Sequence, residues 1–214
     1  LPASRPRWRR NNSAVKEIVL ASSNPGKVRE INQLLATLDL HVQPQSEFGV
    51  VDADETGLTF VENAILKARN AAQHTGLPAI ADDSGIEVDA LNGAPGIYSA
   101  RFAGDSASDQ QNLEKLLTEL EGLPESQRSA RFQCLMVFME HANDPTPVIC
   151  QGTWEGRILT AACGNNGFGY DPVFYVPTHD CSSAELPADM KNSLSHRGQA
   201  LRQLISALQH YRTR

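Results

Sequence analysis

The chain has 214 residues, 41% of them hydrophobic and 21% charged, which is ordinary for a globular protein with a sizeable buried core. No apolar stretch approaches the roughly 20 residues that a membrane-spanning helix requires, so no membrane partner is expected. The four cysteines form no C-x-x-C pair and no zinc-binding pattern. Widely spaced free thiols are typical of a reducing compartment, and we expect a cytoplasmic protein.

The first 14 residues differ in composition from the rest. They include two prolines, no acid and four arginines, Arg5, Arg7, Arg9 and Arg10. No apolar segment follows, so the stretch is not typical of a secretory signal. We expect a disordered basic tail there, followed by a single domain, either one large or one bilobed, over residues 15–214.

Charge outside this tail is strongly negative. The tail holds four of the 19 basic residues, which leaves 15 basic against 25 acidic residues, or −10. Such a body does not attract nucleic acid through its overall field. A phosphate ligand would need local cations, backbone amides or a divalent metal.

A buried first strand is predicted over residues 16–22, followed by a helix. Asn24 is a suitable N-cap and Pro25 a suitable first helical residue. The buried stripe of this helix would comprise Ile31, Leu34, Leu35 and Leu38. A strand end followed by small polar residues and a lysine can bind an anion. The segment consists of Ser22, Ser23, Asn24, Pro25, Gly26 and Lys27. The segment is not a P-loop, because the spacing of that motif is missing. A plain capped helix without a ligand is the alternative interpretation.

A second helix is predicted from a capping box at Thr59 and Glu62 to about Thr75. On it, Asn63 and Lys67 are four residues apart and share one face.

Two adjacent carboxylates, Asp82 and Asp83, follow an apolar run at 77–81 that is typical of a strand. We expect a turn after them at Gly85, then a short strand over 86–88. Crowded acids at a strand end can raise the pKa of one of them or recruit a cation. A solvated loop is the alternative interpretation.

The remaining pattern favours an α/β fold with a mixed central sheet flanked by helices. A third helix is expected over 109–121 and a hairpin from residues 129–141 and 147–158. A glycine-rich loop at 164–171 and a strand at 172–176 follow. The last helix is predicted from about Arg197, with a buried stripe of Leu201, Leu204, Ile205 and Leu208.

Two late segments could contact a ligand. Phe168 lies between glycines and offers a stacking face, and Asp171 could accept a hydrogen bond from a sugar or base. Ser195 is the expected N-cap of the last helix, with His196 and Arg197 in its first turn. Cations are disfavoured there by the helix dipole, so an anionic or carbonyl-bearing ligand would compensate. An irregular loop and a solvated basic pair are the alternatives.

The chain resembles the inosine triphosphate pyrophosphatase family, and most closely its bacterial members, from about Val15 to Leu208. The matching motifs, in order, are residues 20–27 (LASSNPGK), 55–60 (ETGLTF), 62–64 (ENA), 67–68 (KA), 81–85 (ADDSG), 93–101 (GAPGIYSAR), 167–172 (GFGYDP) and 195–198 (SHRG). Two features depart from the family: Ser23 stands where bacterial relatives often have glycine, and the basic tail has no counterpart.

This resemblance implies Mg²⁺-dependent hydrolysis of XTP, dITP and ITP to the nucleoside monophosphate and pyrophosphate. It also implies an elongated mixed sheet, two lobes with a cleft between them, and a homodimer. Asp83 would be the general base and a metal ligand, Glu55 a second ligand, and Asp82 and Asn63 would support them. The triphosphate site would comprise Ser22, Ser23, Asn24, Pro25, Gly26, Lys27, Lys67 and Ser84. The base and sugar site would comprise Phe168, Gly169, Tyr170, Asp171, Lys191, His196 and Arg197.

Selection of these bases needs donors aimed at a 6-oxo group, for which His196 and Arg197 are available. Adenine would leave such donors unpaired, at a cost of about 1–3 kcal/mol each. One alternative function is a similar pyrophosphatase for other modified or ordinary nucleotides. Another is a nucleotide sensor without catalysis. A nucleic-acid-binding module fits the charge poorly.

Overall fold

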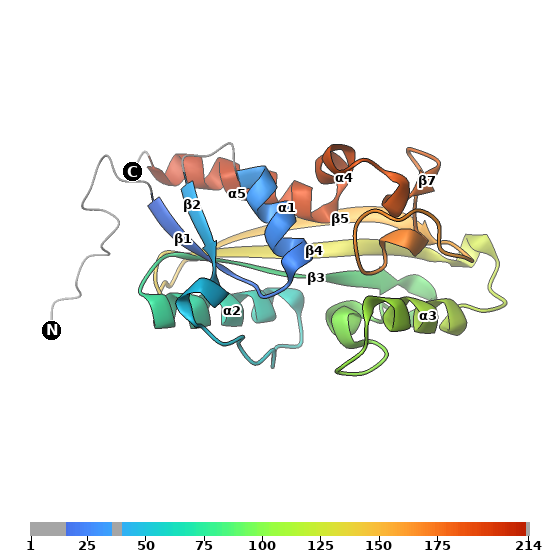
Figure 1. Ribbon diagram of the computed structural model, residues 1–214, viewed down its shortest axis with the longest axis horizontal. Coiled ribbons are helices and arrows are strands. Elements are labelled where there is room, and N and C mark those ends of the chain that lie inside the picture. The colour runs from blue at the N-terminus through green and yellow to red at the C-terminus, as the bar shows by residue number, and fades with distance from the viewer. Residues whose placement is uncertain (1–15, 36–39, 213–214) are drawn as a thin grey trace, which may run out of the picture. The chain divides into compact units, whose positions relative to one another are not determined.

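The computed structural model describes residues 16–35 and 40–212, so the predicted basic tail lies outside the described residues. Within them, seven strands form one sheet in the order β2-β1-β3-β4-β5-β6-β7 (Figure 1). The strands are β1 (Lys16–Ala21), β2 (Leu40–Pro44), β3 (Ala79–Val88), β4 (Ser129–Met139), β5 (Val148–Ile158), β6 (Phe174–Val176) and β7 (Cys181–Ser182). The helices are α1 (Pro25–Leu35), α2 (Phe60–Thr75), α3 (Asp109–Glu119), α4 (Ala188–Leu194) and α5 (His196–Arg212).

The sheet is mixed, which confirms the predicted fold class. Strand β1 pairs in parallel with β2 and β3, whereas β6 pairs antiparallel with β5 and β7. The predicted hairpin is present as the neighbouring strands β4 and β5. Strands β2 and β7 and helix α4 were not predicted. No helix in the described part of the chain is long and apolar enough to cross a membrane.

The chain forms two compact units. Unit 1 contains the described residues up to Asp83, Leu135–Cys150 and those from Leu201 onward. Unit 2 contains Ser84–Cys134 and Gln151–Ala200. The boundary between Asp83 and Ser84 falls inside strand β3.

Small side chains build the core of unit 1 around α2. Four alanines of this helix are buried against β1, β3 and the end of β4: Ala64, Ala68, Ala71 and Ala72. Alanine allows the helix backbone to approach the sheet closely while keeping a high helix propensity. The helix begins and ends as predicted, because the Thr59 side chain accepts a hydrogen bond from Glu62 N and Gly76 adopts a left-handed conformation.

Helix α1 also begins as predicted. The Asn24 Oδ1 atom accepts hydrogen bonds from Gly26 N at 2.9 Å and from Lys27 N at 3.1 Å. Ile31 and Leu35 of the predicted stripe are buried. The stripe residue Leu38 lies outside the described residues.

The predicted turn after Asp82 and Asp83 is wrong. Strand β3 continues through both acids and Gly85 to Val88 as ten residues of strand. The acids remain in a buried strand because Lys27 and Lys67 supply opposite charge beside them.

Aromatic side chains build the core of unit 2. Phe174 lies with its ring centroid 4.5 Å from that of Phe132 and 5.1 Å from that of Trp154. Helix α3 packs Leu113 and Leu116 against this cluster and ends at Glu119, two residues before the predicted end. Helix α5 starts at His196, where Ser195 Oγ accepts from Gly198 N at 3.1 Å, confirming the predicted cap.

Candidate active site

Lys67 is the centre of a charged cluster in unit 1. Its Nζ atom donates to Asp83 Oδ1 at 2.6 Å and to Glu55 Oε1 at 3.1 Å. Lys67 comes from α2, Asp83 from β3 and Glu55 from the segment before α2. Lys67 therefore contacts both carboxylates, and all three residues were predicted from the sequence to bind phosphate or metal.

The cluster shifts the pKa values of its members. Burial raises the pKa of Asp83, and the attraction of Lys67 and Lys27 only partly opposes this effect. For Lys67, burial alone would lower the pKa, but Asp83 and Glu55 outweigh it and the pKa is raised. A buried carboxylate whose pKa is raised toward neutrality is a better proton acceptor than an ordinary surface aspartate.

One oxygen of Asp83 remains available. Among the described residues, the buried Oδ2 atom has no hydrogen-bond partner. A buried carboxylate oxygen with a second carboxylate nearby fits a divalent cation, since Mg²⁺ is commonly held by one or two carboxylates together with phosphate oxygens. In the described ranges, no group of three or more histidine, cysteine or acidic side chains is arranged to hold a metal.

Asp82 has a different environment from Asp83. Its fully buried carboxylate forms an ion pair with Lys27 Nζ at 2.5 Å. Lys27 reaches it from the first turn of α1, and its own side chain is 15% exposed. The structure therefore distinguishes the adjacent acids, because each forms its ion pair with a different lysine.

The predicted phosphate segment is held by its own side chains. Ser22 Oγ accepts from Asn24 N at 3.3 Å, and the Asn24 cap engages the amides of Gly26 and Lys27. Ser23 Oγ donates to Asp52 Oδ2 at 2.6 Å. Asp52 was not singled out from the sequence, where it is one of several acids in a row and carries no distinguishing pattern.

Asn63, predicted as a supporting residue, is fully buried on α2. Its Oδ1 atom accepts from Gly57 N at 2.9 Å. A Cβ atom at Gly57 would lie 2.6 Å from Glu62 Cβ and 2.7 Å from Asn63 Oδ1, so glycine permits this close approach. Asn63 thus fixes the chain two residues after Glu55.

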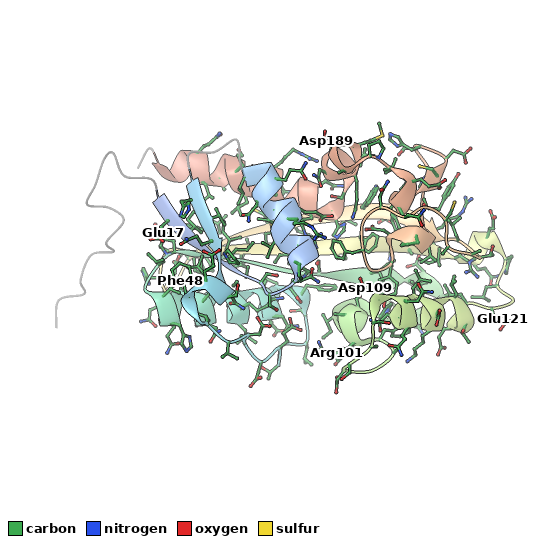
Figure 2. The ribbon with its side chains drawn as sticks, viewed as in Figure 1. Glu17, Phe48, Arg101, Asp109, Glu121 and Asp189 are labelled. Carbon is green, nitrogen blue, oxygen red and sulfur yellow. The ribbon has the colours of Figure 1, made fainter. Side chains whose placement is uncertain are left out.

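Asp171 accepts hydrogen bonds from several residues of unit 2, among them two others that were predicted for the site, Phe168 and Lys191. Its Oδ2 atom accepts from Lys191 Nζ at 2.6 Å and from Phe168 N at 2.8 Å, while Oδ1 accepts from Ser183 Oγ at 2.9 Å. The expected acceptor for a sugar or base is therefore buried and occupied by internal contacts. The neighbouring Gly169 is also hydrogen-bonded within the protein, because its N atom donates to Asp109 Oδ2. Asp109, labelled in Figure 2, is the first residue of α3.

The Phe168 ring lies near two cations. Lys191 Nζ is 5.1 Å from the ring centroid, and the guanidinium carbon of Arg197 is 5.7 Å from it. Arg197 also donates to Ser84 Oγ at 2.9 Å. The structure thus brings Phe168, Lys191 and Arg197, which were predicted for the base site, close to Ser84, which was predicted for the triphosphate site.

Aromatic packing orients His196. Its ring stacks on Phe132 with centroids 4.7 Å apart and an interplanar angle of 11°. Nothing in the local sequence indicates this contact, because Phe132 belongs to a distant strand. Tyr170 is also packed inward, with its hydroxyl donating to Ser99 O at 2.8 Å and its pKa raised by burial.

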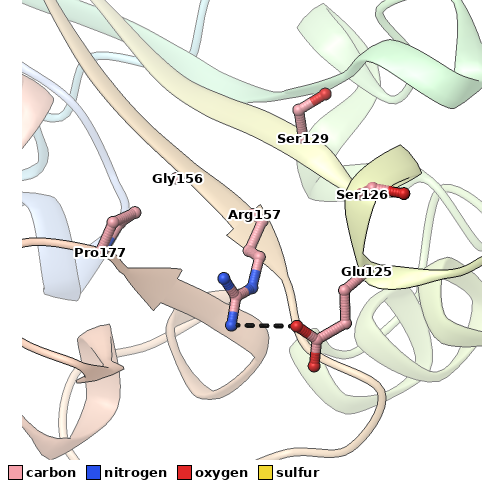
Figure 3. Close-up of a pocket in the computed structure, with 6 residues that line it drawn as sticks. All are labelled: Glu125, Ser126, Ser129, Gly156, Arg157 and Pro177. Carbon is pink, nitrogen blue, oxygen red and sulfur yellow. Dashed lines mark ion pairs between the residues drawn. The ribbon is translucent and has the colours of Figure 1, made fainter.

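A separate pocket of about 490 Å³ lies elsewhere in unit 2 (Figure 3). Arg157 and Glu125 form an ion pair at 3.3 Å within it. Its lining comprises Glu125, Ser126, Ser129, Gly156, Arg157 and Pro177. None of the predicted site residues contributes to this lining, so the pocket is not part of the predicted site.

Fold and site together define an α/β protein with a buried lysine–carboxylate centre. The Ham1 family model matches residues 18–207. The dITP/XTP pyrophosphatase of Vibrio vulnificus (strain YJ016) is 64% identical over 194 residues, covering 91% of this chain and 97% of that protein. The dITP/XTP pyrophosphatase of Vibrio cholerae is 61% identical over 199 residues, covering 93% and 100%.

Solved structures give the same result. The HAM1 protein from Coxiella burnetii superposes with a TM-score of 0.85 at 54% identity, covering 92% of this chain and all of that one (100%). The Ham1 protein of Staphylococcus aureus gives 0.81 at 45% identity, with 92% and 100% covered. The chain belongs to the Ham1 family, which confirms the resemblance inferred from its motifs.

Proposed function

We propose that this chain hydrolyses the α–β phosphoanhydride of XTP, dITP and ITP, releasing the nucleoside monophosphate and pyrophosphate. The observation that carries the proposal is the Lys67 cluster, in which a buried carboxylate has one oxygen paired and one available. Relatives named dITP/XTP pyrophosphatase, at 58–64% identity over most of the chain, supply the substrate class.

Asp83 is the general base in this proposal. Its Oδ2 atom accepts a proton from the attacking water, and in the protein without nucleotide Lys67 holds the other oxygen and so fixes the carboxylate. The raised pKa of Asp83 makes it a stronger base for this proton transfer.

Glu55 and Asp83 would hold the metal, which we take to be Mg²⁺. When bound, the metal neutralises charge on the phosphate oxygens and stabilises the leaving pyrophosphate. Lys67 contacts both carboxylates and would give up its contact with Asp83 Oδ1 for a phosphate oxygen, which would leave Oδ1 for the metal and Oδ2 for the proton of the attacking water. Lys27, with residues 22–26, would orient the remaining phosphates.

Unit 2 would hold the base. The Phe168 ring provides a face on which the base would stack. Asp171 holds the backbone of Phe168 in place by accepting a hydrogen bond from its amide. Arg197 and His196 supply donors for a 6-oxo group. His196→Ala and Arg197→Ala should therefore reduce the preference for ITP over ATP, and an unchanged preference would refute this assignment.

A homodimer and a cytoplasmic location are further parts of the proposal; the dimer rests on the family resemblance, and the location rests on the four free cysteines. Light scattering of the purified chain tests the dimer directly.

The test of the activity compares ITP, XTP, dITP and ATP with and without Mg²⁺. Pyrophosphate and orthophosphate are measured separately, and Asp83→Asn is run in parallel. The proposal predicts pyrophosphate from the first three nucleotides, little from ATP, and a strong dependence on Mg²⁺ and Asp83. Orthophosphate as the product, or equal rates with ATP, would contradict it.

A further inference from the structure

The segment that carries Glu55 has no regular secondary structure. Residues 50–59 contain neither helix nor strand, and we call residues 51–58 the strap. Its two large apolar side chains, Val51 and Leu58, are 81% and 82% exposed. Apolar packing therefore contributes little to holding the strap, and its position depends on polar contacts.

Those polar contacts lie on both sides of Glu55. After it, Gly57 N donates to Asn63 Oδ1 at 2.9 Å and Leu58 N donates to Glu62 Oε2 at 2.9 Å. Both acceptors belong to α2. Since Lys67 is on the same helix, these bonds place the C-terminal side of the strap relative to the Lys67 cluster.

Before Glu55 the strap has two anchors among the described residues: Val51 O accepts from Asn70 Nδ2 of α2 at 2.8 Å, and the Asp52 side chain is the second. Asp52 Oδ2 accepts from Ser23 Oγ at 2.6 Å, and Asp52 Oδ1 accepts from the buried Gln45 amide. Ser23 directly precedes Asn24, the cap of α1, and Lys27 in that helix holds Asp82. The Ser23 hydroxyl therefore links the strap to the segment proposed to bind phosphate.

We propose that Ser23 is a positioning residue: by holding Asp52, its hydroxyl fixes the strap so that Glu55 stays beside Lys67 and Asp83. The consequence for metal binding rests on the proposed function of Glu55 as a ligand. Residues that orient a ligating carboxylate commonly change metal affinity when they are removed. Ser23 then acts through Asp52 and Glu55, and not by direct contact with phosphate.

Hydrogen–deuterium exchange of the metal-free, nucleotide-free protein tests the link without depending on activity. Ser23→Ala should speed exchange of the strap amides about two- to fivefold, the effect of losing one partly solvated hydrogen bond. Ser23→Thr, which keeps the hydroxyl, should exchange like the wild type. Gln110→Ala is the matched control, because it removes one exposed side-chain bond, that from Gln110 to Glu114 at 2.8 Å, within α3 of unit 2.

A double variant separates the link from unrelated effects. If Ser23 acts through Asp52, Ser23→Ala should add nothing to the exchange of Asp52→Ala. Calorimetric titration with Mg²⁺ should show affinity weakened about tenfold in Ser23→Ala and unchanged in the Gln110→Ala control.

Unchanged strap exchange in Ser23→Ala, or additive effects in the double variant, would overturn the proposal. Direct phosphate binding by Ser23 would instead raise the KM for ITP while strap exchange stayed at the wild-type level. If exchange responds as expected but ITP is not hydrolysed, the proposed function fails while the Ser23–Asp52 link stands.

Discussion

Lys67 Nζ donates to Asp83 Oδ1 at 2.6 Å. The other oxygen of the same carboxylate is buried and has no hydrogen-bond partner among the described residues, so it is available to accept a proton. The lysine therefore does two things to the acid. It holds the carboxylate in place, and its charge restrains the pKa that burial would otherwise raise further.

Lys67→Ala should move the acid limb of the pH–rate profile. Asp83 must be deprotonated to act as a base, so kcat/KM falls as the pH drops through its pKa. Removing Lys67 removes the attraction that lowers this pKa, while burial continues to raise it. We expect the limb at higher pH and a rate about 100-fold lower at neutral pH.

Lys67→Arg is the control for this experiment, because it keeps a positive charge. The profile of kcat/KM for ITP against pH should keep its acid limb near the wild-type position. An acid limb that does not move in Lys67→Ala would mean that a group other than Asp83 titrates.

Lys27→Ala should destabilise the protein strongly. The Asp82 carboxylate is fully buried, and Lys27 is its ion-pair partner at 2.5 Å. An uncompensated buried charge costs about 3–5 kcal/mol, measured as the loss in the free energy of unfolding in urea.

The matched variants depend on the difference in burial between Asp82, which is fully buried, and Lys27, which is partly exposed. Asp82→Asn alone should cost less, because Lys27 is 15% exposed and can turn its charge toward water. Lys27→Ala with Asp82→Asn should be more stable than Lys27→Ala alone. A double variant less stable than that single variant would show that Asp82 is held by other interactions.

Asp171→Asn should weaken nucleotide binding more than it slows the chemical step. The substitution removes the charge that pairs with buried Lys191 and loosens the Phe168 amide. We expect the KM for ITP to rise about tenfold, the effect of losing roughly 1.4 kcal/mol of binding, with a smaller change in kcat.

Ser183→Ala is the comparison for this variant, since it removes only the 2.9 Å contact to Asp171 Oδ1. Its KM should change about twofold, within the range of one neutral hydrogen bond. A kcat loss without a KM change in Asp171→Asn would assign Asp171 to the chemical step.

Gly152→Ala should disturb the start of helix α5. A Cβ atom at this position of β5 would lie 2.0 Å from His196 O and 2.8 Å from Ala200 N, so the helix must shift. We expect a reduced preference for ITP over ATP, measured as the ratio of kcat/KM values, because His196 and Arg197 move with it.

Gly156→Ala in the same strand is the control. Its Cβ would lie 2.5 Å from Tyr175 O and 2.6 Å from Phe174 Cζ, a comparable clash with β6 and not with the backbone of α5. Both variants should lose stability, but Gly156→Ala should keep the ITP preference. Equal loss of preference in both would make the effect one of general destabilisation.

Local signals explain which elements could be predicted. The Thr59 cap, the Asn24 cap and the Ser195 cap each depend on residues within one helical turn, and all three are present. The start of α5 therefore placed His196 and Arg197 correctly on its first turn.

Charged and polar contacts between residues far apart in the sequence explain the features that could not be predicted. Asp82, Asp83 and Gly85 are typical of a turn in the local sequence, yet the strand continues because lysines from α1 and α2 neutralise the acids. Asp171 similarly has the pattern of an exposed acceptor, and its burial depends on Lys191 and Ser183, which follow later in the chain. The role of Asp52 depends on Ser23 in the same way.

The most direct test of the central claim is the pyrophosphate released from ITP by the wild type and by Asp83→Asn at equal Mg²⁺. We predict one pyrophosphate for each IMP from the wild type. For Asp83→Asn, we predict a rate lower by about 10²–10⁴-fold, as expected when a general base is removed. A wild-type rate in Asp83→Asn would contradict the account.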